Sequence, residues 1–338
     1  MKAVFLSVLL LTASALANQE SAQTLYDQAV IPWEQGKKEG WDKMLQAASA
    51  GSTEALCVIG EAYQGTSLIA SEKANKYFEM AAKQGALCGM IALSNLGSGA
   101  ILDAKLNEDG GSVDWTAKSI SVAKQRAENN DIDAIKTYAF IEATKKDYNS
   151  YCKWMEKAAK LGDADAMKQL AGHIKDGCGW YLIPGSRKKA VYYWTEQAAI
   201  NGHPDAIATM AIKQCDQGDY KGFFEWFDKA VDMADYSALD TMSAVLRGDK
   251  DLSVCNVPEQ YLDKVRAYSY MYAIHKQVPE LEKNRAALLS EEFSNPYFMS
   301  KLEKELTIEQ VNSAKEWAEK WMKNHRIRTY GLIFYRFL

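Results

Sequence analysis

The residues of this chain that could do chemistry at neutral pH are few and scattered. It has four histidines, and none of their spacings fits a shared metal site. The sequence contains no G-x-S-x-G and no H-E-x-x-H, and no glycine-rich phosphate loop follows a strand. We therefore expect no catalytic residue, no metal and no cofactor, and hence no enzyme. We interpret the histidines as surface or half-buried residues: His173, His203, His275 and His325.

The composition is that of an ordinary globular protein with a mild negative charge. Hydrophobic residues make up 48% of the chain and charged residues 25%, which is enough apolar material for a large core. The formal net charge is −4. Because the lysines are scattered, this balance argues against a nucleic-acid partner.

Residues 1–17 have the three parts of a secretory signal peptide. Lys2 precedes an apolar run from Ala3 to Leu11, and small residues follow up to Ala17. We expect cleavage after Ala17 and export to a bacterial periplasm. No cysteine follows that site to carry a lipid. No later run approaches the ~20 apolar residues of a membrane-spanning helix.

If the chain is exported, its cysteines are expected to form disulfides, because an oxidising compartment favours these bonds. All six follow residue 17, none forms a C-x-x-C, and their spacings do not fit zinc. Three disulfides are therefore the expected number. The cysteines are Cys57, Cys88, Cys152, Cys178, Cys215 and Cys255.

A pattern of paired alanines followed by glycine recurs along the chain. An aromatic residue stands four positions before the first alanine in three copies, so ring and alanines share one helical face. The glycine is the residue that ends a helix with a left-handed cap at least cost. The pattern predicts helix pairs. Its copies are Ala47-Ala48-x-x-Gly51, Ala81-Ala82-x-x-Gly85, Ala158-Ala159-x-x-Gly162 and Ala198-Ala199-x-x-Gly202.

The residues between two of these stops resemble a known repeat. Residues 51–85 read G-x-x-x-A-x-x-x-[apolar]-G-x-x-Y-x-G…K-A…Y-F…A-A-x-x-G, which resembles the Sel-one-like repeat, a relative of the tetratricopeptide repeat. Residues 162–202 match it again. The resemblance implies an all-α fold, a right-handed α-α superhelix in which helix pairs stack as a solenoid. Residues 97–115 and those after 247 depart from the pattern.

The two ends of such a solenoid differ from its middle, because a terminal repeat must cover the core with a polar outer face. We expect the solenoid to span residues 18–325, with capping helices over residues 256–325 that resemble the closing element of exported members. The apolar tail, residues 326–338, is too short to span a bilayer. We expect it to pack on the last repeat, with binding of a partner as the alternative.

The solenoid also narrows the disulfide pairing, because a repeat contacts only its neighbours. Cys57 and Cys88 fall on the first helices of adjacent repeats, and the other four cysteines fall at one edge of the stack. We predict the sequential pairs Cys57–Cys88, Cys152–Cys178 and Cys215–Cys255. The alternative pairs Cys178 with Cys215 and leaves Cys152 and Cys255 free.

The concave side of a helix-pair solenoid is lined by the first helix of each pair. The repeat register places polar residues of both charge signs there, with few apolar anchors, and this mixture suits a polar protein partner. The predicted partner-binding residues are Glu54, Glu61, Gln64, Asp133, Lys136, Phe140, Asp165, Lys168, Lys175, Asp176, Asp205, Ile212, Asp240 and Arg247.

The resemblance implies a function in protein binding. Exported Sel-one-like proteins include periplasmic immunity proteins that neutralise toxins delivered by type VI secretion, notably phospholipase effectors, and this is our first hypothesis. The alternative is a cell-envelope scaffold or regulatory adaptor that binds endogenous proteins. A disulfide-rich hydrolase is a third class, for which the sequence offers no catalytic constellation.

Overall fold

The computed structural model describes residues 21–64, 68–94 and 113–329, and in these ranges the regular elements are helices. A single isolated β-bridge joins Asp235 and Arg328 within the described part of the chain. The expected signal peptide, residues 97–112 of the segment that departs from the repeat pattern, and residues 330–338 of the apolar tail lie outside the described residues.

The helices form consecutive pairs, which is the predicted all-α solenoid. The first helices are α3 (Thr53–Tyr63), α5 (Leu87–Ala92), α7 (Ile132–Thr144), α9 (Ala164–Lys175), α11 (Pro204–Asp216) and α13 (Tyr236–Leu246). The second helices are α4 (Leu68–Lys83), α6 (Trp115–Glu128), α8 (Tyr148–Lys160), α10 (Ser186–Ile200) and α12 (Tyr220–Asp232).

Additional helices close the two ends. A helix over residues 21–34 and helix α2 (Lys38–Ser49) precede the first complete pair. The closing helices are α14 (Lys264–Gln277), α15 (Pro279–Leu289), α16 (Asn295–Leu302) and α17 (Ile308–Asn324), with short 3-10 turns at η1 (Glu259–Tyr261) and η2 (Glu291–Phe293). Among the described residues, no helix is both long and apolar enough to cross a membrane.

The helix stops follow the repeat motif. Gly51 and Gly162 end their helices with φ of 97° and 98°, a conformation that glycine adopts at little cost. Where the motif lacks its glycine, other residues take the same left-handed conformation: Asn130 and Lys146 at 64° and Ala234 at 57°. The backbone geometry of the repeat is therefore kept even in copies whose sequence pattern is weak.

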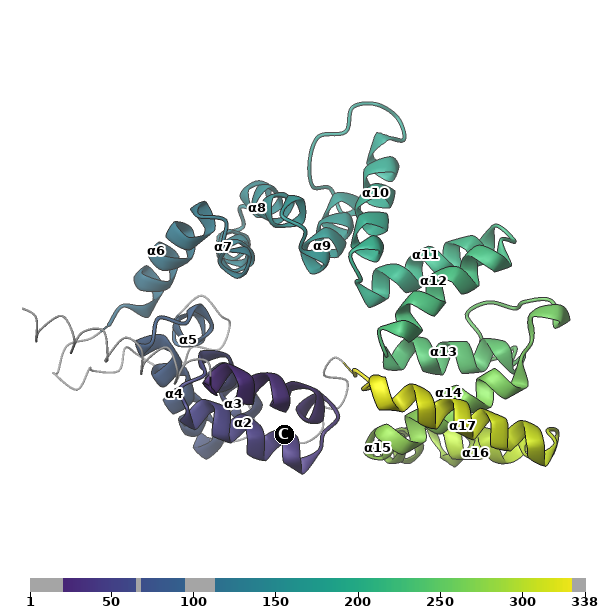
Figure 1. Ribbon diagram of the computed structural model, residues 1–338. Coiled ribbons are helices and arrows are strands. Elements are labelled where there is room, and N and C mark those ends of the chain that lie inside the picture. Colours follow the sequence, from purple (N-terminus) through teal and green to yellow (C-terminus); the bar gives the residue numbers. More distant parts are fainter. Residues whose placement is uncertain (1–20, 65–67, 95–112, 330–338) are drawn as a thin grey trace, which may run out of the picture.

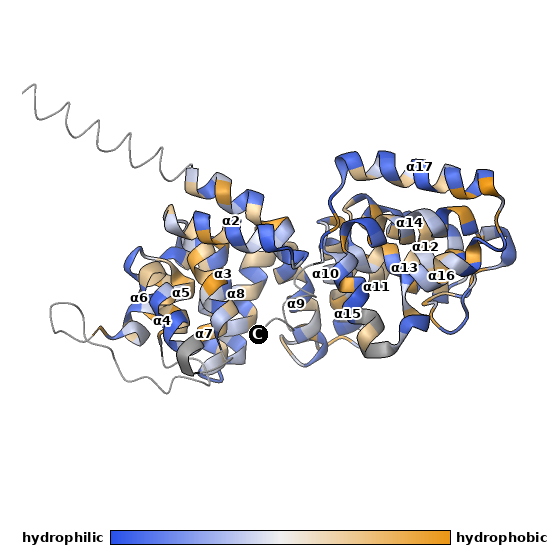
Figure 2. Ribbon diagram, turned by 90° about the horizontal axis from the view of Figure 1, so that it is seen from below, coloured by the Kyte–Doolittle hydropathy of each residue, from blue (hydrophilic) through white to orange (hydrophobic). Residues whose placement is uncertain are grey.

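The paired alanines lie in the core, as their pattern predicts. Ala81, Ala82 and Ala158 are fully buried. Gly60 leaves room for the Phe78 ring, because a Cβ at this position would lie only 2.6 Å from the ring. Each helix carries hydrophobic and hydrophilic residues (Figure 2), as expected when one face packs on neighbouring helices and the other meets water.

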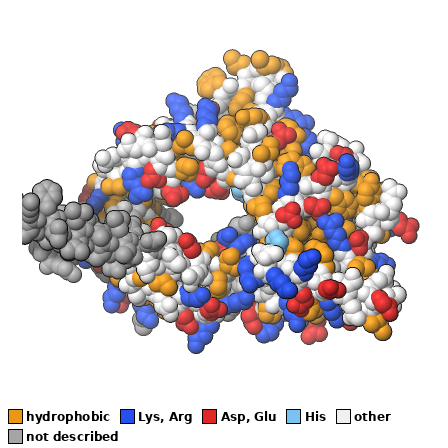
Figure 3. Space-filling view, viewed as in Figure 1, with side chains coloured by type: hydrophobic (Ala, Val, Ile, Leu, Met, Phe, Trp, Pro, Cys, Tyr) orange, Lys and Arg blue, Asp and Glu red, His pale blue; other side chains and the backbone are white. Residues whose placement is uncertain are grey.

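The stack of pairs curves until the segment after α17 reaches the end of the first helix, so the molecule is a ring (Figure 1). The space-filling view shows an opening through the middle of this ring (Figure 3). The closure joins residues 34 and 35, at the end of the first helix, to residues 325–329, which follow α17. We call these two segments the clasp.

On its N-terminal side, the clasp is held by polar contacts between residues far apart in the sequence. Arg328 binds Glu34 through two nitrogens, Nε at 2.5 Å and Nη2 at 2.6 Å from the carboxylate oxygens. The Gln35 amide donates to the carbonyl of Ile327 at 2.7 Å, and Gln35 is only 2% exposed. The Thr329 hydroxyl donates to the carbonyl of Glu34.

The other side of the clasp is bound to the solenoid itself. The Arg328 amide donates to Ala234 O at 2.9 Å, and the Tyr236 amide donates to Arg328 O at 3.0 Å. The Ile327 amide donates to Gln277 Oε1 at 2.9 Å. The tail is expected on the last repeat; its residues 327–329 also contact Glu34 and Gln35, near the other end of the described chain.

Candidate functional site

First helices line the inner side of the ring in the central repeats. Helices α7 and α9 lie toward the opening, and α8 and α10 lie outside them (Figure 1). This follows from the repeat, because the alanines of each second helix pack against the first helix and leave the polar side of the first helix uncovered. We use the name inner face for the exposed and half-buried polar side chains of α7, α9 and the start of α11.

Lys136 on α7 is the centre of a charged cluster on the inner face. Its Nζ lies 3.3 Å from a carboxylate oxygen of Asp163, 3.7 Å from one of Asp165 and 3.8 Å from one of Asp133. One cation thus meets three carboxylates from two neighbouring repeats. The cluster keeps a net negative charge, which is available to a partner.

The cluster continues onto the next repeats through Asp165. Gln169 Nε2 donates to Asp165 at 3.0 Å, and His203 Nε2 lies 3.9 Å from the other carboxylate oxygen. The hydroxyl of Tyr151 donates to Gln169 at 3.3 Å. These contacts hold the inner-face side chains in fixed positions, which lowers the entropy lost when a partner binds.

Most of the predicted partner-binding residues are accessible. Lys136, Lys168, Ile212 and Asp240 are half-buried. The exposed members of the set are Glu54, Glu61, Gln64, Asp133, Phe140, Asp165, Lys175, Asp176 and Asp205. The structure brings Asp133, Lys136 and Asp165 into contact with one another.

Arg247 differs from the rest of that set. Its side chain is 9% exposed, and its Nη2 lies 3.1 Å from Asp249. Its guanidinium stacks 3.9 Å from the centroid of the Phe298 ring. The sequence pattern indicates a groove residue, but Asp249 and Phe298 cover most of the Arg247 side chain, which thus connects α13 to α16.

The acidic side chains near the ring are in different electrostatic surroundings. Glu61 on α3 is exposed at its surface, yet desolvation by the surrounding protein raises the pKa of its carboxyl group. Asp235, at the clasp, is 5% exposed, and burial together with the nearby Asp205 raises its pKa to about 6. Asp235 still caps α13, since its carboxylate accepts the Ala238 amide at 2.7 Å.

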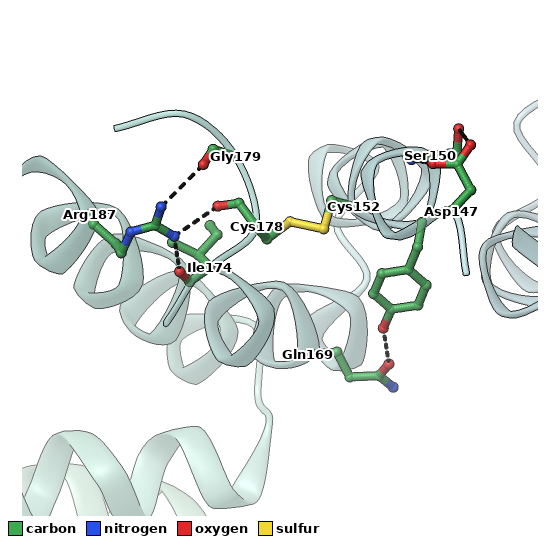
Figure 4. The surroundings of a disulfide bond; sticks show 9 residues. Asp147, Ser150, Cys152, Gln169, Ile174, Cys178, Gly179 and Arg187 are labelled. Carbon is green, nitrogen blue, oxygen red and sulfur yellow. Dashed lines mark hydrogen bonds between the residues drawn. A yellow bond between two sulfur atoms is a disulfide. The ribbon is translucent and has the colours of Figure 1, made fainter. Parts of the chain in front are cut away.

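The disulfides join neighbouring repeats in the pairs expected from the sequence. Cys57–Cys88 has a Cα separation of 6.1 Å, Cys152–Cys178 of 6.2 Å and Cys215–Cys255 of 6.0 Å. The second bond ties α8 to the loop that follows α9 (Figure 4). Each one therefore links a repeat to the next one along the chain.

Two features of the structure are not predicted from the sequence. One is the clasp, for which no local pattern gives a signal. The other is the loop between α9 and α10, where Trp180 is 90% exposed, Leu182 86% and Ile183 73%. A signal for this loop was present, because the run W-Y-L-I-P stands between two glycines and outside the repeat motif.

A cavity of about 540 Å³ lies between α12, α14 and α17. Its polar groups already bind one another: Arg266 pairs with Asp228 and donates to the Tyr270 hydroxyl at 2.7 Å. Burial raises the pKa of Tyr270 to about 12. Within the described ranges, no group of three or more His, Cys, Asp or Glu residues is arranged to hold a metal ion.

The stacked helix pairs, joined by disulfides between neighbouring repeats, define the class of this protein. It is an α-solenoid whose motif resembles the Sel-one-like repeat. No family model and no curated protein matches the chain. Two solved structures are similar to it over most of its length. One is a protective antigen present in uropathogenic Escherichia coli strains that displays an SLR fold, with 16% identity and a TM-score of 0.42.

The match to that antigen covers 93% of this chain and 63% of the other, so this chain spans less than two thirds of its length. The other structure is a Sel1 repeat protein from Oxalobacter formigenes. It has 20% identity and a TM-score of 0.39, and the match covers 94% of this chain and 90% of that one.

Proposed function

We propose that this protein is an exported binding protein that holds another protein on the inner face of its ring. The observation that carries the proposal is the ordered charged network around Lys136 and Asp165, which spans three repeats. A fixed array of charges is suited to recognising a polar protein surface, because it gains specificity without reorganising.

Export to the periplasm is part of this proposal. The signal-peptide pattern in residues 1–17 supports it, and so do the three disulfides, because such bonds persist in oxidising compartments. The bonds also keep neighbouring repeats in register, so the inner face holds its shape outside the cell's reducing interior.

The more specific proposal is that the partner is a phospholipase-type toxin delivered by type VI secretion and that this chain is the immunity protein against it. Support comes from the resemblance to exported Sel-one-like proteins and from an inner face whose acidic side chains suit a basic surface on the partner. Binding alone is enough for this role, because a bound toxin cannot reach its substrate.

The experiment uses the toxin encoded nearest to this gene and strains that carry or lack the gene. We expect the strain without the gene to die when the toxin reaches its periplasm, and the wild-type gene to restore survival. The purified proteins should form a stoichiometric complex in calorimetry. The double variant Asp165→Lys/Asp205→Lys should weaken that complex by at least about tenfold, because exposed charges dominate recognition.

The matched control reverses two accessible charges on second helices, Glu156→Lys on α8 and Glu225→Lys on α12, and should leave affinity unchanged. If the inner-face and second-helix variants bind equally well, the inner face is not the binding surface. If no toxin affects survival, and a cell-envelope protein binds the inner face instead, the immunity role is wrong and the chain is an adaptor.

A further inference from the structure

The loop between α9 and α10 projects away from the ring, on the side opposite the opening (Figure 1). It spans residues 176–185 and presents large apolar side chains to water: Trp180, Leu182 and Ile183 are 90%, 86% and 73% exposed. Of the large hydrophobic residues in the described ranges, these are three of the four most exposed. We call these three residues the apolar tip.

The base of the loop is fixed. Cys178 is bonded to Cys152 on α8 (Figure 4). Arg187, in the first turn of α10, donates to the carbonyls of Ile174 at 2.5 Å, Cys178 at 3.1 Å and Gly179 at 3.2 Å. The apolar tip is therefore held outward by its base and is not an unrestrained segment.

The loop is also fixed on its return toward α10. Arg187 lies 4.9 Å from the centroid of the Tyr181 ring, and the Ser186 hydroxyl donates to the carbonyl of Ile183 at 2.6 Å. Tyr181 is thus turned toward the protein, while its neighbours Trp180 and Leu182 face water. Exposing these side chains has a cost in water that the folded monomer does not recover.

The charge around the apolar tip is positive, although the whole chain has a formal net charge of −4. Residues 177–195 contain Arg187, Lys188 and Lys189 and no acidic residue; Asp176 stands at the start of the loop. Lys188 and Lys189 are exposed, and no ion pair to another described residue engages them. In the space-filling view, Lys and Arg side chains border the apolar top of the molecule (Figure 3).

The two lysines are not placed to stabilise their helix. They lie in the first turn of α10, and this turn has no acidic residue. The N-cap residue, Gly185, has no side chain that could accept a hydrogen bond from the first amides. Positive charge at a helix N-terminus is unfavourable because the helix dipole already places partial positive charge there. An anion beside this turn would offset both charges.

We propose that the apolar tip and the two lysines form a docking site for an anionic lipid membrane. Trp180, Leu182 and Ile183 enter the boundary between headgroups and acyl chains, where tryptophan is favoured. Lys188 and Lys189 bind the lipid phosphates. The tip is convex, and it combines apolar and cationic groups within one short segment, which fits a lipid surface better than a pocket in a protein.

The membrane site and the inner face lie on opposite sides of the ring wall. A partner can therefore occupy the inner face while the loop is docked, and the membrane proposal does not depend on what the inner face binds. Docking would hold the ring at the membrane surface without a spanning helix.

The test measures flotation of the oxidised protein with vesicles, after mass spectrometry has shown that residues 1–17 are absent. Vesicles of phosphatidylcholine mixed with phosphatidylglycerol are compared with vesicles of phosphatidylcholine alone. We expect binding to the anionic vesicles that weakens at high salt. Trp180→Ser/Leu182→Ser should lower the partition coefficient at least about tenfold, since most of the inserted apolar area is lost.

Lys188→Glu/Lys189→Glu should lower binding to anionic vesicles by at least about twentyfold, because each lysine near an anionic surface contributes roughly fivefold. Two control variants should bind like the wild type: Ile200→Ser, a 60% exposed apolar residue at the other end of α10, and Lys124→Glu/Lys320→Glu, which makes the same charge change elsewhere. All these positions are exposed, so no melting temperature should fall. That of Lys188→Glu/Lys189→Glu should rise slightly, because the change places negative charge at the N-terminus of α10.

Three outcomes would overturn the proposal. The first is that the wild-type protein does not float with anionic vesicles. The second is that the tip and control variants bind equally. The third is that Trp180→Ser/Leu182→Ser abolishes concentration-dependent self-association and leaves vesicle binding unchanged, which would make the apolar tip a contact between two copies of this chain.

Discussion

The repeat stack and the clasp hold the same ring together by opposite means. In the stack, contacts and disulfides join near neighbours, and the bonded cysteines are 26 to 40 residues apart. In the clasp, the partners are 292 to 295 residues apart. The stack repeats one motif along the chain, whereas each clasp contact occurs once.

The difference shows what a solenoid needs in order to close. Each pair adds a small rotation to the previous one, so the position of the last helix relative to the first is a sum over all repeats. The clasp forms only if that sum brings residue 328 to residue 34. The contacts between residues 34–35 and 327–329 therefore depend on the geometry of every repeat.

The largest effect on stability is expected from removing a disulfide between neighbouring repeats. Cys215→Ala/Cys255→Ala should lower the free energy of unfolding by about 3–4 kcal/mol, because the bond closes a loop of 40 residues in the unfolded chain. Urea unfolding of the oxidised proteins measures it. A loss below about 1 kcal/mol would mean that the repeats need no staple.

Opening the clasp should cost somewhat less. Arg328→Ala leaves Glu34, whose side chain is 13% exposed, without its bidentate partner, and should lower the free energy of unfolding by about 2–3 kcal/mol. Small-angle scattering should show a larger radius of gyration. The control is Arg326→Ala, which removes an exposed arginine of the same segment whose hydrogen bonds go to the neighbouring carbonyls of Met322 and His325. An unchanged radius would show that the curvature of the stack closes the ring by itself.

The stability of the fold should also respond to pH through Asp235, which lies between the two residues that bind the Arg328 backbone. Its pKa is raised from 3.8 to about 6, so the folded protein binds this proton more tightly than the unfolded chain does. That contribution to stability is complete below pH 3.8 and is lost as the pH rises through 6. Asp235→Asn should therefore raise the free energy of unfolding at neutral pH by about 2–3 kcal/mol, because one pKa unit corresponds to ~1.4 kcal/mol.

The same substitution should have little effect near pH 4, because the wild-type carboxyl group is then largely neutral in the folded state. Denaturant titrations across this pH range provide the measurement. Asp219→Asn, which alters the same kind of cap at an exposed position on α12, is the control. An equal stability difference at both pH values would contradict the role of the buried charge.

The smallest effect on stability is expected from the inner face. Asp165→Asn should change the free energy of unfolding by less than about 0.5 kcal/mol, because half-exposed ion pairs contribute little. The same variant should still weaken partner binding. A large loss of stability would show that the network around Lys136 belongs to the framework of the stack rather than to a binding surface.

The candidate site was predictable only in part. The register placed Asp133, Lys136 and Asp165 on first helices, and the structure joins them through Lys136. Arg247 has the same register, but its side chain is only 9% exposed, because the chain after α13 leaves the repeat pattern. The apolar tip was readable as a run of large residues in a loop, but whether its side chains were covered depended on packing.

By itself, the sequence determined the all-α class, the helix stops and the neighbouring cysteines, since these depend on contacts within one repeat or between adjacent ones. A repeated local contact leaves a repeated local pattern. Only the tertiary structure decided that Arg328 meets Glu34 and that Trp180 stays in water. Those outcomes depend on the summed rotation of all the helix pairs and on what remains uncovered after they pack, and neither leaves a periodic trace in the chain.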